Sequence, residues 1–339
     1  MLKNHKFIFI YTFFGLVFLF FCILSWGAVK IPFNEIFSIL MGGSENSTFS
    51  RIIWELRLPR AFCSMTAGAS LGIAGLMMQT YFQNPLAGPF VLGIHSGSSL
   101  AVAFFIMSGS LIGMTLPQEL SMAGAAISSI IGGAFVFFLL ILVSLRVKGN
   151  VILLVMGLLF GYFASGLISL LISVTDAQKI KTYLMWSLGS FQGKSFNELM
   201  LLSICLGISL LWSLFLGKRL NVLLLGENYA KSLGLNFRRF KFEVLTLTAI
   251  LSGAVTAICG PVAFIGIMAP HISRKIFSSQ DHFVLIPGVF LTGSVLGLFA
   301  EFISGLGITT VLPINAILGL LGAPFILFFL IGNRRMLNE

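Results

Sequence analysis

The segment Phe7–Leu24 reads FIFIYTFFGLVFLFFCIL and decides the class of the fold. It contains no charged residue, and fourteen of its residues are Phe, Ile, Leu or Val. At about −0.3 to −0.6 kcal/mol each, these side chains favour membrane insertion by roughly 4 to 8 kcal/mol, more than one central charge would cost. The run is too long for a signal peptide, and no A-x-A-like cleavage site follows Trp26 and Gly27. We therefore predict a first membrane helix from Phe7 to about Val29.

The composition of the whole chain points to the same class. Of its 339 residues, 57% are apolar and 9% are charged, whereas an average soluble domain is about 25% charged. A mean hydropathy of +1.02 cannot be hidden in one soluble core, because a compact domain still needs a polar surface. The four cysteines lie far apart and form no C-x-x-C pair. These features exclude an ordinary cytosolic enzyme, a disordered protein and a secreted disulfide scaffold.

Nine further apolar runs approach the length of about 20 residues that a membrane helix needs. They lie near 61–80, 90–113, 120–145, 151–173, 198–216, 242–259, 261–277, 284–304 and 313–332. We therefore predict an all-α, polytopic membrane protein of about ten transmembrane helices, with residues 1–339 in a single transmembrane domain. The pairs of runs around Pro85 and Pro261 are ambiguous, because each could be one broken span or two.

The basic residues predict the orientation of the chain. Ten crossings place both termini on one side, and the loops on that side hold fourteen of the 21 Lys and Arg residues. Because cytoplasmic loops carry an excess of Lys and Arg, we predict that both termini are cytoplasmic. The largest loop on this side is 217–241, with six basic residues and one acidic residue. The net charge of +10 is scattered over short loops, so it does not predict nucleic-acid binding.

The apolar runs lack residues on which several membrane functions depend. Ion-coupled transporters usually carry buried carboxylates or histidines, but Glu243 and Glu301 fall near predicted helix ends, where we expect exposure to water. The histidines show no H-E-x-x-H spacing. The segment Gly189–Ser195 resembles a phosphate loop but has three residues between its glycines where the motif needs four, so we predict a tight turn before a helix. We predict no catalytic residue and no metal site, and energy for transport would come from a partner acting on loop 217–241.

Small residues four positions apart occur in several runs. They are Gly68 with Gly72, Gly124 with Ser128 and Gly132, Gly253 with Ala257, and Gly293 with Gly297. On a helix such residues form one stripe and let two backbones approach closely. We therefore predict a tightly packed bundle.

Two proline-containing breaks interrupt the apolar runs. They are Asn84–Ile94 (NPLAGPFVLGI) and Gly260–Ile267 (GPVAFIGI), and both contain Gly-Pro, a short apolar stretch and Gly-Ile. Interrupted helices at matching places in two halves predict an internal repeat that lines a pathway. Irregular backbone at membrane depth is tolerated only where it is buried in protein or faces a wet cavity. The alternative is a coincidence between two proline kinks.

At these breaks the chain resembles the FecCD family of permeases, from about Arg57 to Gly332. An ordered series of segments carries the resemblance: Arg57–Arg60 (RLPR), Ala67–Gly75 (AGASLGIAG), Met78-Gln79, Asn84–Ala87 (NPLA), Leu92–Gly97 (LGIHSG), Trp186–Ser190 (WSLGS), Leu225–Leu235 (LGENYAKSLGL), Gly260–Arg274 (GPVAFIGIMAPHISR), Leu312–Asn315 (LPIN) and Leu321–Pro324 (LGAP). Each segment alone is weak, but the series in this order is specific.

The resemblance implies a permease subunit of an ATP-binding-cassette importer in the inner, or plasma, membrane of a prokaryote. Such a subunit forms the translocation channel for an iron chelate, a siderophore on family frequency, with haem or cobalamin as other cargoes. The implied partners are a second permease copy, identical or related, two ABC ATPase subunits and an extracytoplasmic substrate-binding protein. ATP would be used by the partner, and this chain would be no enzyme and bind no cofactor. The alternatives are a stand-alone secondary transporter or channel, and a membrane-embedded enzyme or scaffold.

The family's coupling helix, which seats in a groove of the ATPase, corresponds to the segment near 225–235. Gly226 would begin this helix, Glu227 would lie in its first turn, where a negative charge suits the helix dipole, and Gly234 would close it. The alternative is a surface helix on a long loop. The resemblance assigns ATPase coupling to Leu225, Gly226, Glu227, Ala230, Leu233 and Gly234.

Two arginines match those with which the family contacts glutamates of the binding protein. These are Arg57 and Arg60, and arginine suits such bidentate contacts. The alternative is anchoring of a helix end at the lipid surface. The family often has an Asp and an Arg four residues apart near the ninth helix, where this chain has Glu301 and Gly305. One docking contact is therefore absent or has moved.

The translocation pathway would be lined by the 84–97 segment, the span near Leu153–Ile172 and the last span after Pro313. The predicted pathway residues are Asn84, Pro85, Leu92, Gly93, His95, Ser96 and Pro313. His95 could contact cargo or form a hydrogen bond to a neighbouring helix, as a lone polar residue in a bundle more often does. For His271 we expect a local hydrogen bond and no metal.

Overall fold

The structure is a computed structural model that describes residues 2–27, 29–43, 48–111, 118–146, 150–306 and 312–332. Throughout these ranges every regular element is a helix, so the predicted all-α class is confirmed. The helices are α1 (Leu2–Ser25), α2 (Phe33–Leu40), α3 (Thr48–Arg51), η1 (Ile52–Arg57), α4 (Leu58–Phe82), η2 (Pro89–Leu92), α5 (Ile94–Leu111), α6 (Gln118–Arg146), α7 (Asn150–Ser173), α8 (Ala177–Ser187), α9 (Phe196–Leu223), α10 (Glu227–Ser232), α11 (Phe237–Cys259), α12 (Ile265–Phe277), α13 (His282–Ser304) and α14 (Ile314–Gly332).

Each of the ten predicted apolar runs corresponds to one helix, namely α1, α4, α5, α6, α7, α9, α11, α12, α13 and α14. Within the described ranges, seven stretches are long and apolar enough to cross a membrane, and α5 and α14 contain shorter apolar stretches. Helix α12 has 13 residues, fewer than the roughly 20 that a full crossing needs. The first helix ends at Ser25, which makes its span shorter than the predicted one to about Val29.

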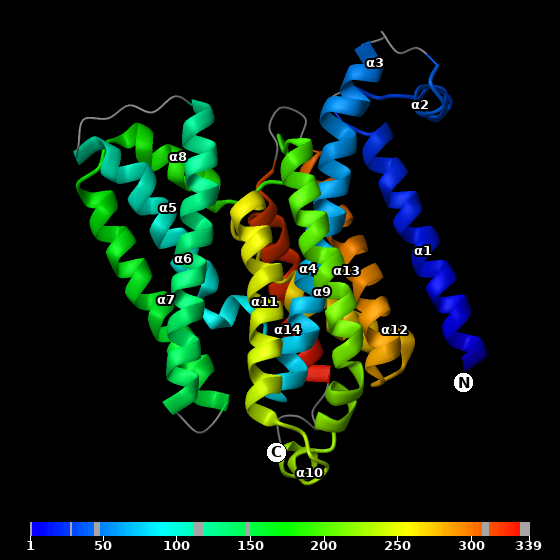
Figure 1. Ribbon diagram of the computed structural model, residues 1–339. Coiled ribbons are helices and arrows are strands. Elements are labelled where there is room, and N and C mark those ends of the chain that lie inside the picture. Colours follow the sequence, from blue (N-terminus) through cyan, green and yellow to red (C-terminus); the bar gives the residue numbers. More distant parts are fainter. Residues whose placement is uncertain are drawn as a thin grey trace.

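Helix α4 lies at the centre of the bundle and packs against α9, α11, α12 and α13. Helices α5, α6 and α7 form a second group beside α11, and α1 lies on the other side of the molecule against α13 (Figure 1). The short helix α10 lies at one end of the bundle, where α1 begins and α14 ends, while α2 and α8 lie at the opposite end (Figure 1). We call these the α10 end and the α2 end.

Glycines bring α4 against its neighbours. Gly68 faces Gly293 of α13 and Gly75 faces Gly266 of α12, with no room for a Cβ atom at any of the four positions. The predicted close approach is thus confirmed here, because backbone meets backbone. It is wrong for Gly253 on α11, where nothing lies within 4 Å of the place that a Cβ atom would take.

The first break, residues 83–93, connects α4 to α5. Gln83 ends α4 in the left-handed conformation (φ 48°), and Gly93 (φ 73°) follows the 3-10 turn η2. The break supplies its own hydrogen bonds, because Asn84 accepts from the amides of Leu86 (2.9 Å) and Ala87 (3.0 Å). It is therefore a compact turn that supports itself.

The second break, residues 260–264, connects α11 to α12. Gly260 (φ 77°) and Phe264 (φ 64°) both have positive φ angles, which is uncommon for a bulky residue such as phenylalanine. A Cβ atom at Gly266 would lie 2.8 Å from Cδ of Pro89, so the two breaks meet inside the bundle. Because α4 runs toward the α10 end and α11 runs away from it (Figure 1), the breaks belong to helix pairs of opposite direction. The internal repeat itself stays a prediction.

Candidate functional site

A turn, a short helix and a second turn form the α10 end of the molecule. Gly226 precedes α10 with φ 101°, and Gly234 follows it with φ 85°. Both conformations favour glycine, because a Cβ atom would clash with the backbone. Asn236 then caps α11 by accepting a hydrogen bond from the amide of Arg239 (3.1 Å). The sequence thus folds this segment into a short helix with sharp bends on both sides, as predicted.

Three large apolar side chains are exposed on this segment, beside exposed polar ones, although it lies at the tip of the bundle. The side chains of Leu225 and Leu233 are 64% and 58% exposed, and Tyr229 is exposed beside them. Ala230 on the inner face is fully buried, and Glu227 accepts from Lys231 one turn later (2.6 Å). Exposed apolar side chains grouped on a loop indicate a surface that contacts another molecule.

Behind α10, two arginines hold a glutamate. Arg219 of α9 and Arg239 of α11 both contact Glu243, the latter at 3.0 Å between Nε and Oε1. Glu243 is buried, so the expectation that it is exposed to water is wrong, because two cations compensate the loss of solvent. A cleft of about 430 Å³ beside this cluster is lined by Lys218, Arg219, Val222, Leu233, Gly234, Leu235, Asn236 and Arg239.

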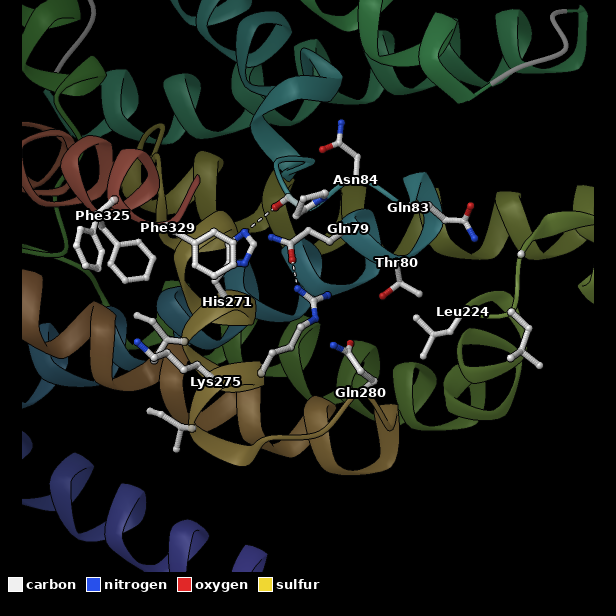
Figure 2. A pocket seen from close by; sticks show the side chains of 17 residues that line it. Gln79, Thr80, Gln83, Asn84, Leu224, His271, Lys275, Gln280, Phe325 and Phe329 are labelled. Atoms are coloured by element: carbon white, nitrogen blue, oxygen red, sulfur yellow. Dashed lines mark hydrogen bonds between the residues drawn. The ribbon is translucent and has the colours of Figure 1, made fainter. Parts of the chain in front are cut away.

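A larger cavity also lies at the α10 end, between the end of α4, α12, α14 and the turn before α10 (Figure 2). We call it the polar pocket. Its volume is about 1150 Å³. It is lined by Gln79, Thr80, Gln83, Asn84, Pro85, Leu224, Leu225, Gly226, His271, Ile272, Arg274, Lys275, Ile276, Gln280, Phe325, Phe328 and Phe329.

A hydrogen-bond network crosses the floor of the polar pocket. Gln79 donates to the carbonyl of Ile267 (3.2 Å) and accepts from the guanidinium of Arg274 (2.5 Å). His271 donates from Nε2 to the carbonyl of Pro85 (2.8 Å), and its ring packs on Phe329 (Figure 2). The local bond predicted for His271 is confirmed, and it ties α12 to the first break.

A second polar network links three helices next to this pocket. Thr80 of α4 contacts His282 of α13 (2.8 Å), and the His282 ring contacts Asn221 of α9 (2.7 Å). Asn221 in turn donates to Asp281 (2.7 Å). The amide of Phe283 and the side chain of Asn221 lower the pKa of Asp281, because both hydrogen bonds favour the charged carboxylate.

The predicted pathway residues do not form one surface. Asn84 and Pro85 line the polar pocket, whereas Leu92, Gly93 and His95 are buried between helices. Ser96 and Pro313 are half-buried.

Of the two roles considered for His95, the structure shows the contact between helices. Its Nδ1 lies 2.5 Å from the hydroxyl of Thr256 on α11, and its ring stacks on Phe90. Close by, Gly93 passes the backbone of Gly157 on α7, where a Cβ atom would lie 2.8 Å from the carbonyl oxygen.

Sequence reasoning missed the residue that holds the second break. Asn315 of α14 donates to the carbonyl of Pro261 (2.7 Å) and accepts from the amide of Ala263 (3.1 Å). It also donates to the carbonyl of Ser187 at the end of α8 (3.3 Å). A polar residue in the quoted Leu312–Asn315 segment, next to an apolar helix, was the signal that could have found it.

At the α2 end, the two arginines predicted for docking already have partners. Arg57 is 6% exposed, and its guanidinium donates to the carbonyls of Leu24 and Val29. It joins the end of α1 to η1, and its role in docking stays a prediction.

Arg60 forms an ion pair with Glu301 (2.5 Å), and the Glu301 side chain is fully buried. The expectation that Glu301 is exposed to water is therefore wrong, and the reason is the partner on α4. A Cβ atom at Gly305 would lie 2.5 Å from Nη2 of Arg60. The glycine that departs from the family pattern thus leaves space for this arginine.

The glycine-rich segment before α9 is a turn. The segment Gly189–Ser195 is a turn with Gly189 and Gly193 at positive φ, and Ser195 caps α9 in a reciprocal pair with Glu198, which confirms the predicted turn before a helix. In the described ranges no group of three or more His, Cys, Asp or Glu residues could hold a metal ion.

Comparison with known proteins gives consistent matches over most of the chain. The model of the FecCD transport family matches residues 15–332. The hemin transport system permease of Yersinia pestis is 30% identical over 312 residues, 91% of each chain, and a vitamin B12 import system permease of Serratia proteamaculans is 31% identical over 280 residues, 82% of this chain and 81% of the relative. A solved structure titled as an inward-facing metal-chelate type ABC transporter is 25% identical with a TM-score of 0.80, and the match covers 96% of this chain and 99% of the other.

Proposed function

Because the chain belongs to the FecCD transport family and is a permease of an ABC importer, we propose that it forms the channel through which an iron chelate enters a prokaryotic cell across the inner membrane. A siderophore is our preferred cargo. Hemin and vitamin B12, the cargoes named for two relatives, are the other candidates. The chain itself would bind no cofactor and would take its energy from ATP hydrolysis on separate subunits.

The observation that carries this proposal is the apolar tip of α10. Leu225 before α10, Tyr229 on it and Leu233 after it are exposed. The positive-φ glycines Gly226 and Gly234 bend the chain on either side of the helix. Such a segment is rigid enough to transmit a displacement and apolar enough to seat in a groove of a partner. We propose that each permease inserts this segment into one ATPase subunit, with both termini and the α10 end in the cytoplasm.

The partly uncovered helices α7 and α14 support a second permease copy. Tyr162 of α7 is 77% exposed, and Leu320 and Phe328 of α14 are 77% and 76% exposed. One copy leaves these faces open, whereas two copies around an axis could enclose a channel between them. The first break and the polar pocket would then form the cytoplasmic part of the pathway, and an extracytoplasmic binding protein would deliver cargo at the α2 end.

The test uses the chain reconstituted in proteoliposomes with its ATPase and binding protein. Leu225→Ser with Leu233→Ser should abolish co-purification of the ATPase and reduce ATP-driven uptake at least tenfold. Both side chains are already exposed, so the bundle should stay folded. Leu184→Ser with Met185→Ser, which changes two exposed residues of α8 at the other end, should keep the ATPase bound.

A second pair of changes tests transmission. Replacing Glu227 and Gly234 with alanine should leave ATP hydrolysis in place while uptake falls, because the bend after α10 requires a positive φ. Unchanged uptake would contradict the role assigned to α10. Uptake driven by an ion gradient, without ATPase and ATP, would instead favour a stand-alone secondary transporter, and chemical turnover by the isolated chain would favour an enzyme.

A further inference from the structure

The polar pocket contains positive charge without a matching negative charge. Arg274 and Lys275 are among its lining residues, and none of the lining residues is acidic. The other polar lining groups include the amides of Gln79, Gln83 and Asn84, which can donate hydrogen bonds to an anion. The pocket therefore favours an anionic group over a cationic one.

Arg274 differs from the two other half-buried arginines of the described chain, whereas the more deeply buried Arg57 also lacks a carboxylate and donates to two backbone carbonyls. Arg60 is paired with Glu301, and Arg219 with Glu243. Arg274 forms none of the described ion pairs, and the partner of its Nη1 is the amide oxygen of Gln79. A guanidinium removed from water without a carboxylate is costly, so a ligand that supplies the missing anion would be stabilised there.

The opposite wall of the pocket is aromatic. Phe325, Phe328 and Phe329 of α14 line it, and Figure 2 shows the labelled rings of Phe325 and Phe329 on the side of the pocket away from Gln83. The volume of about 1150 Å³ is slightly above the range of about 300 to 1,000 Å³ that is usual for small-molecule sites. An occupant would thus have an apolar body on the phenylalanines and an acidic group on the basic residues.

We propose that the polar pocket binds an amphipathic anion, with a carboxylate or phosphate held by Arg274 and Lys275 and an apolar body on the α14 phenylalanines. Arginine offers two parallel N–H donors to such a group. Two sources share this chemistry: a carboxylate-bearing cargo on its way to the cytoplasm, and the headgroup of an anionic lipid.

Native mass spectrometry of the full-length chain in detergent distinguishes the sources. One arm uses hemin and its dimethyl ester, in which both carboxylates are masked. The other arm uses phosphatidylglycerol and zwitterionic phosphatidylcholine. We expect the anionic member of at least one pair to bind at least tenfold more tightly than its partner. Preference within the hemin pair assigns the site to cargo, and preference within the lipid pair assigns it to lipid.

Substitutions locate the binding. Arg274→Gln and Lys275→Gln should each lower the affinity for the anionic probe about tenfold, the value expected for loss of a charged hydrogen bond. Lys275 is exposed, so its replacement should not affect folding, and Arg274→Lys should restore part of the affinity lost in Arg274→Gln. Lys181→Gln on α8 removes the same charge at the α2 end and should change nothing.

Two results would overturn the proposal. One is equal binding of the charged and masked members of both pairs, and the other is anion binding that is as strong in Lys275→Gln and Arg274→Gln as in the unchanged chain. Because binding is measured without the ATPase, failure of the proposed transport function would leave this outcome unaffected.

Discussion

The two breaks in the bundle perform the same geometric task by different means. Each interrupts the chain after a long helix and starts a shorter helix inside the bundle, but residues 83–93 form turns with hydrogen bonds of their own. Residues 260–264 are held at two backbone groups by one side chain of another helix, Asn315 of α14, whereas the first break receives a bond from His271 of α12 in addition to its internal bonds. The internal bonds of the first break can persist when neighbours move, and the second break can follow α14.

The contact of α4 with the start of α12, next to the two breaks, should be the least tolerant point of the fold. Gly75→Ala would place a methyl group on the backbone of Gly266, so α4 and α12 must separate. We expect the free energy of unfolding to fall by about 3 kcal/mol, measured by thermal unfolding in detergent micelles. Gly253→Ala, which meets no atom within 4 Å, should be neutral or gain up to about 1 kcal/mol. Equal effects of the two changes would contradict the packing described here.

Asn315→Leu tests the dependence of the second break on α14 directly. It removes the bonds to Pro261 and Ala263 and leaves buried backbone groups without partners, which should cost about 2 to 3 kcal/mol. Uptake should fall as well, since α12 would lose its fixed starting point. Asn315→Asp keeps the acceptor for the amide of Ala263 but loses the donor to the carbonyl of Pro261. Its unfolding temperature should therefore lie between those of the unchanged chain and Asn315→Leu.

Asn84→Ala is the matching change in the first break. It removes only the side-chain bond to the amide of Leu86 (2.9 Å) and leaves the remaining turn in place. We expect the free energy of unfolding to fall by about 1 kcal/mol or less, again measured from the thermal unfolding transition. A loss as large as that of Asn315→Leu would show that the first break is no more independent than the second.

The smallest effect should come from the network beside the first break. Because hydrogen bonds lower the pKa of Asp281 in the folded state, its stabilisation is present above the unfolded pKa of about 3.9 and is lost as pH falls through the lower folded value. The unfolding temperature should therefore drop more between pH 5 and pH 3 in the unchanged chain than in Asp281→Asn. An equal drop in both chains would show that Asp281 does not contribute this stabilisation.

The features predicted from the sequence are those that depend on a local pattern of residues. The ten apolar helices follow from hydropathy, because a membrane helix needs a run of apolar residues over its own length. The bounds of α10 follow from Gly226 and Gly234, because the two glycines allow the positive φ angles that bend the chain on either side.

What sequence reasoning missed depends on partners that are distant along the chain. Glu301 is buried because Arg60, 241 positions earlier, neutralises its charge. Arg57 is buried where its guanidinium donates to the carbonyl of Leu24 near the end of α1. Asn315 stands out as a polar residue beside an apolar helix, but the sequence does not show that it bonds to the backbone of the second break. Gly253 belongs to a small-residue stripe, but nothing lies within 4 Å of the place that its Cβ atom would take, since spacing alone does not say which position meets a neighbour.

The positions at which α5 and α12 begin have an electrostatic consequence. Both helices start inside the bundle, near the contact of Pro89 with Gly266, and each amino end carries about half a unit of positive charge from its aligned peptide dipoles. The positive ends of these helices disfavour a bare cation at this depth. On the proposed function, a metal enclosed in a negatively charged chelator would meet no such barrier.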